Sequence, residues 1–80
     1  MGKAEIQQAI GLLRKQEPTF GDIQNALNLV TASGVRNSDV EVALYFSKVG
    51  NNQQAKTQAG KAADELSKII EGAFSTIRNI

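Results

Sequence analysis

Three chain-breaking positions divide this 80-residue sequence into four segments. Pro18 pushes the residue before it out of the α region, while Gly34 and Gly50 suit the turns that follow helices. Between the breaks, apolar residues recur every three or four positions, which is the spacing of one helix face. The sequence therefore predicts an all-α fold, a small bundle of about four helices with a long amphipathic C-terminal helix. The expected helices cover residues 3–16, 20–32, 39–49 and 54–79.

Two capping patterns indicate where helices start. Thr19 stands three residues before Asp22, and Ser38 stands three residues before Glu41; both pairs have the form of a capping box. The second pair matters most, because residues 40–46 are rich in β-formers and a strand is the competing interpretation. The Ser38 cap favours a helix, and its nearly all-round apolarity predicts that it is the most buried helix of the bundle.

Two further expectations concern Gly11 and the last helix. Gly11 lies inside the first predicted helix, where glycine costs about 1 kcal/mol relative to alanine, and we expect it to let a neighbour approach closely. The last helix begins with a polar, marginal part over residues 54–61. Its apolar stripe follows, and we expect four members to serve the core: Leu66, Ile69, Ile70 and Phe74.

The composition limits the chemistry. Eighty residues suffice for a single domain, residues 1–80, and the absence of cysteine leaves no disulfide or thiolate metal site. Histidine, the usual general base at neutral pH, is also absent. No group of residues has the spacing of a catalytic, metal or cofactor site. We therefore expect a protein that is not an enzyme and that binds no cofactor.

The charge and the apolar runs bear on location and partners. Nine basic residues against eight acidic ones give a net charge of +1, whereas nucleic-acid binders usually show a clear basic excess. No apolar run approaches the roughly 20 residues that span a bilayer, and the N-terminal residues lack the pattern of a signal peptide. We expect a cytoplasmic protein with no membrane span.

One alternative is a small helix-turn-helix DNA-binding regulator, because residues 20–32 and 39–49 flank a turn that contains Gly34. Such a protein would dimerise through its C-terminal helix. Asp39 and Glu41 count against it, since their carboxylates would meet phosphates. The residues that would face DNA in this alternative are Arg36, Val42, Tyr45 and Lys48.

The favoured interpretation is a non-enzymatic helical protein–protein interaction module, in the form of a small regulator or inhibitor that occludes a partner surface. Ile77 and Ile80 lie one or two turns beyond the apolar residues assigned to the core. Partner burial is the simplest way to remove them from water. The partner is another protein or a second copy of the chain in a homodimer. The candidate partner-binding residues are Tyr45, Phe74, Ile77 and Ile80.

Overall fold

The computed structural model describes the backbone of residues 2–78 and the side chains as far as residue 72. Over this part of the chain it contains four α-helices and no strand, which confirms the predicted all-α fold. Each helix packs against the next, and α1 also packs against α4. The helices are α1 (Lys3–Leu13), α2 (Phe20–Ala32), α3 (Ser38–Lys48) and α4 (Asn52–Arg78).

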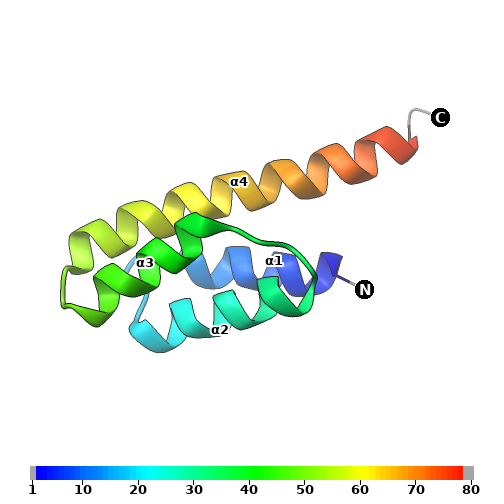
Figure 1. Cartoon of the computed structure of the whole chain (residues 1–80). Helices are drawn as coiled ribbons and strands as arrows, with labels where there is room; N and C mark the ends of the chain where they lie inside the picture. Colours follow the sequence, from blue (N-terminus) through cyan, green and yellow to red (C-terminus); the bar gives the residue numbers. More distant parts are fainter. Residues whose placement is uncertain (1, 79–80) are drawn as a thin grey trace.

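The bundle is antiparallel, and α4 is much longer than the other helices (Figure 1). Contacts between residues far apart in the sequence agree with this arrangement: Arg14 at the end of α1 pairs with Asp64 of α4, and Asn37 before α3 reaches Glu65. The far end of α4 extends past the ends of α1 and α2 (Figure 1). The molecule is accordingly elongated, with extents of 46 × 20 × 18 Å. No helix in the described part is long and apolar enough to cross a membrane.

Two helix boundaries differ by more than one residue from those expected from the sequence. α1 ends at Leu13, three residues before the predicted end, because Leu13 is its last buried side chain and Arg14 already leaves helical geometry (φ −90°, ψ 4°). α4 starts at Asn52, two residues earlier than predicted. Asn51 explains this early start, since its Oδ1 accepts a hydrogen bond from the Gln54 N–H at 3.4 Å.

Glycines end both α2 and α3 in the same way. Gly34 has φ +79° and Gly50 has φ +83°, the left-handed conformation that only glycine adopts readily. The following N–H then reaches back to the last turn of each helix. Val35 donates to the Val30 carbonyl at 3.2 Å, and Asn51 donates to the Phe46 carbonyl at 2.8 Å. The predicted glycine stop after the second helix is confirmed.

The two predicted capping boxes have different outcomes. At the start of α2, the Asp22 N–H donates to Thr19 Oγ1 at 3.1 Å and the Thr19 N–H donates to Asp22 Oδ2 at 3.0 Å, as predicted. At the start of α3, the predicted Ser38 cap is wrong, because Ser38 is already the first helical residue. The cap is Asn37, whose Oδ1 accepts from the N–H groups of Asp39 and Val40 at 2.9 and 3.2 Å.

The core of the described chain is rich in alanine and draws on all four helices. Seven of its thirteen buried hydrophobic residues are alanines, and α4 alone contributes Ala55, Ala59, Ala62 and Ala63. Residues 54–61, expected to be a polar and marginal part of the last helix, are helical throughout and place Ala55 and Ala59 in the core. Small side chains there let α4 lie close against its neighbours. The assignment of Ile69 to the core is wrong, since Ile69 is 42% exposed. Leu66 is buried and Ile70 partly buried, as expected, whereas the Phe74 side chain lies outside the described residues.

Candidate interaction surface

α3 has a second apolar face that points away from the core. Val42, Tyr45 and Val49, the last being the C-cap residue directly after α3, are spaced at i, i+3 and i+7, and they are 37%, 61% and 57% exposed. Val40 and Ala43 lie on the inner face and are fully buried. The prediction that this is the most buried helix is therefore wrong. We call Val42, Tyr45 and Val49 the α3 stripe.

An aromatic contact supports the centre of the α3 stripe. The rings of Tyr45 and Phe46 meet edge to face, with centroids 5.8 Å apart and planes at 63°. Phe46 is itself partly buried and packs against the core, so Tyr45 rests on a side chain that is already held. Such pairs contribute about 0.5–1.5 kcal/mol beyond the area they bury. The exposed ring therefore loses less freedom when a partner covers it than an unsupported side chain would.

Two opposite charges border the α3 stripe on one side. Glu41 and Lys48 are seven residues apart, and a helix with 3.6 residues per turn brings such residues to nearly the same side. Both are exposed. The ion pairs found in the described part of the chain are Arg14–Asp64 and Lys15–Asp22, so neither Glu41 nor Lys48 belongs to one. Asp39, near the start of α3, lies on the other side of the α3 stripe.

The structure places the predicted partner-binding residues unevenly. Tyr45 is the most exposed large hydrophobic residue among those described. The side chains of Phe74 and Ile77, and the whole of Ile80, lie outside the described residues, so their assignment stays a prediction.

The residues of the DNA-binding alternative are all exposed but are not gathered into one site. Arg36 precedes α3, whereas Lys48 is its last residue. An eleven-residue helix rises about 16 Å, so the two cations lie at opposite ends of it. Val42, Tyr45 and Lys48 follow one another at three-residue spacing along α3, and the first two are part of the α3 stripe.

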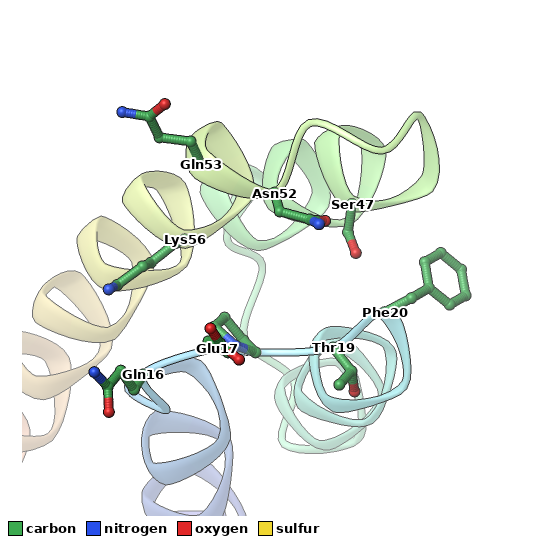
Figure 2. Close-up of a pocket in the computed structure, with 9 residues that line it drawn as sticks. Gln16, Glu17, Thr19, Phe20, Ser47, Asn52, Gln53 and Lys56 are labelled. Atoms are coloured by element: carbon green, nitrogen blue, oxygen red, sulfur yellow. The ribbon is translucent and has the colours of Figure 1, made fainter.

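A crevice of about 470 Å³ lies at the end of the bundle where the loops meet (Figure 2). Glu17 and Lys56 are the charged residues of its lining, and the remainder is mostly amide and hydroxyl groups. The Phe20 ring turns away from the other labelled side chains (Figure 2) and is 44% exposed. Within the described part of the chain, no cluster of three or more metal-ligating side chains occurs here or elsewhere.

Two carboxylates of the described residues, Glu5 and Asp22, have lowered pKa values, and both act at helix starts. The Thr19 N–H holds the pKa of Asp22 below its ordinary value, and the Lys15 ammonium adds to this effect. The pKa of Glu5 is lowered by hydrogen bonds from its own N–H and that of Gly2. These shifts therefore reflect caps of α2 and α1 and not a reactive centre.

A shallow groove between α1 and α2 was not foreseen in the sequence. Leu12 and Leu29 are partly buried beneath a rim of amide side chains, and the groove encloses about 520 Å³. Gly11 borders it, and a Cβ there would meet no atom within 4 Å. The expectation that Gly11 admits a close neighbour is therefore wrong for the described residues. The spacing of Val42, Tyr45 and Val49, by contrast, is a signal that the sequence does contain.

Comparison of the chain with protein-family models, with curated protein sequences and with solved structures gives no significant match.

Proposed function

We propose that this chain is a non-enzymatic protein–protein interaction module that binds its partner through the α3 stripe. One observation carries the proposal. Five large hydrophobic residues are exposed in the described chain, and three of them lie in a line along α3 and its C-terminal end: Val42, Tyr45 and the C-cap residue Val49. Single exposed apolar residues are ordinary on protein surfaces, whereas contiguous ones mark sites that another surface covers.

The chemistry of the α3 stripe favours a protein partner. A tyrosine stands between two valines, and tyrosine is enriched among the residues that dominate binding energy at protein interfaces. Anchors at i, i+3 and i+7 are also how one helix enters the groove of another protein. Asn37 caps the start of α3, and its C-cap residue Val49 is followed by Gly50 in the left-handed conformation, so the α3 stripe is a preformed surface.

The finer role that we propose is that of a regulator or inhibitor which occludes a surface of its partner. A preformed helix face can cover a complementary groove without first paying the entropy of folding. Binding would in turn stabilise this small domain, because a partner that binds only the folded state shifts the folding equilibrium.

The DNA-binding alternative has less support. Its two cations lie at opposite ends of α3, while Asp39 and Glu41 both stand in the first turn of that helix. Few phosphates would be neutralised in such a pose. We expect DNA binding at a Kd of about 10⁻⁴ M or weaker at physiological salt. A sequence-specific complex of submicromolar affinity would favour this alternative over the protein-binding one.

Site-specific photocrosslinking tests the proposed function. A photoreactive phenylalanine analogue replaces Tyr45 in one variant and Phe20 in the other, since both positions hold exposed aromatic rings and only Tyr45 lies in the α3 stripe. In the cells that produce the chain, we expect discrete protein adducts from position 45 that are absent from position 20. Equal adducts from both positions, or none from position 45, would contradict a partner site on α3.

A further inference from the structure

We infer that the protein which covers the α3 stripe is a second copy of the same chain, with the two α3 helices antiparallel about a two-fold axis. This inference rests on the proposed function, because it names the partner of the same surface. It follows from the pattern of apolar residues along α3 and from the positions of the charges beside them.

The apolar pattern is self-complementary when the helices run in opposite directions. Val42 and Val49 are seven residues apart, about 10.5 Å along the helix, and a two-fold axis midway between them passes beside Tyr45. Val42 of one copy then faces Val49 of the other, and the reverse contact follows by symmetry. The two Tyr45 rings meet near the axis, where an interface is most fully desolvated.

The charges complete the match. In an antiparallel helix pair, the same flank of each helix meets its own equivalent. Glu41 and Lys48 share one flank of the α3 stripe, so Glu41 of one copy faces Lys48 of the other, and the pair forms twice. Their positions along the common axis differ by about two residues, or 3 Å, which two long side chains span. Both are exposed, and in the described chain neither has an ion-pair partner of its own.

A parallel pair would lose this match. Opposite flanks then meet, which brings Glu41 towards Asp39 of the other copy and leaves Lys48 beside the partly buried Phe46. Like charges that face each other across an interface are unfavourable. The antiparallel arrangement is therefore the one that the charges select.

The dimer is expected to be weak. Three partly exposed side chains from each copy bury well below the roughly 1,200 Å² that specific, stable interfaces reach. We expect a reversible dimer with a Kd on the order of 10⁻⁴ M, which exchanges partners quickly and weakens as salt screens its charged flank.

Charge exchange tests the inference most sharply. Sedimentation equilibrium is measured from about 10 µM to 1 mM for the wild type, Glu41→Lys, Lys48→Glu and the double variant. In a dimer of either single variant, two pairs of like charges face each other across the axis, so we expect the dimer Kd to rise about tenfold or more. The double variant restores both pairs and returns to a Kd near that of the wild type. An equimolar mixture of the two single variants restores both pairs as well, so it should dimerise better than either alone.

Apolar variants and folding controls complete the experiment. Tyr45→Ser should abolish the dimer, and Phe20→Ser, which removes an exposed aromatic ring outside the α3 stripe, should leave it unchanged. Circular dichroism checks that each variant keeps the helical fold. A wild type that is monomeric at 1 mM would overturn the inference. A dimer that is insensitive to Tyr45→Ser, or that the mixture of charge variants fails to restore, would overturn it as well.

The outcome also separates this inference from the proposed function. Adducts from position 45 that contain a different protein, together with a monomeric wild type, would retain the interaction module and reject the homodimer. The absence both of a dimer and of any adduct from position 45 would reject the two together.

Discussion

Asn37 joins α3 to α4 through the two ends of one amide group. Its Oδ1 accepts hydrogen bonds from the first N–H groups of α3, and its Nδ2 donates to Glu65 Oε1 on α4 at 3.2 Å. The residue that starts α3 therefore also fixes where α4 lies beside it. The α3 stripe depends on this junction, because the rotation of α3 about its axis decides which of its two apolar faces is turned outward.

Replacing Asn37 tests this junction. Asn37→Ala removes the cap and the contact with Glu65, and we expect it to lower the free energy of unfolding by about 0.5–2 kcal/mol. Ser38→Ala is the matched control, since Ser38 lies inside the helix and should change stability little. Urea denaturation followed by circular dichroism measures both. A larger loss of stability for Ser38→Ala than for Asn37→Ala would mean that Ser38, and not Asn37, caps α3.

Much of the fold is predictable because its signals are local. Gly34 and the Thr19–Asp22 cap act through the backbone within a few residues and placed both ends of α2 correctly, whereas Pro18 placed the end of α1 three residues too late. The cap of α3 was not predictable in this way. Asn37 and Ser38 are both good capping residues, and the contact that accompanies Asn37 comes from Glu65, twenty-eight residues away.

The candidate site was only partly predictable, because α3 carries two apolar faces. Tyr45 was identified as a binding residue, yet the helix as a whole was expected to be the most buried. The inner face is selected by contact with α4, where alanines at positions 55, 59 and 62 are fully or almost fully buried. Hydrophobicity alone assigns alanine little weight, so the sequence directs attention to Ile69, which is 42% exposed. Small residues at helical spacing were the missed signal.

Replacing Gly11 by alanine is expected to stabilise the fold. A Cβ at this position would meet no atom within 4 Å, and glycine inside a helix costs about 1 kcal/mol relative to alanine. We therefore expect Gly11→Ala to raise the free energy of unfolding by roughly 0.5–1 kcal/mol. Gly34→Ala is the contrasting variant, because φ +79° strains any residue with a Cβ and should cost about 1–2 kcal/mol. The midpoints of thermal and urea denaturation should shift in opposite directions for the two variants. A loss of stability in Gly11→Ala would mean that a neighbouring group lies against that face of α1.

The lowered pKa of Asp22 predicts that the fold loses stability in acid. This pKa is lowered in the folded state, chiefly by the Thr19 N–H and further by Lys15. A carboxyl group with a lowered folded pKa stabilises the fold above its unfolded pKa, and that stabilisation is lost as the pH falls through the folded value. The wild type should therefore exceed Asp22→Asn in stability at pH 6, and the difference should shrink below about pH 4. Urea denaturation across this range measures it, and a difference that is constant with pH would contradict the assignment.

The alanines of α4 make the core intolerant of larger side chains. Ala59 is 0% exposed and lies in the series that includes Ala55, Ala62 and Ala63. Leucine at position 59 adds three heavy atoms where the helices already touch, and overpacking of this kind costs about 1–3 kcal/mol. The matched control is Ala32→Leu, because Ala32 is exposed at the end of α2 and the same side chain there should change stability by less than about 0.5 kcal/mol. Urea denaturation compares the two variants, and similar midpoints would mean that α4 does not pack through its alanines. A small domain has only about 5–15 kcal/mol of stability in total, so Ala59→Leu should also lower the thermal midpoint by several degrees.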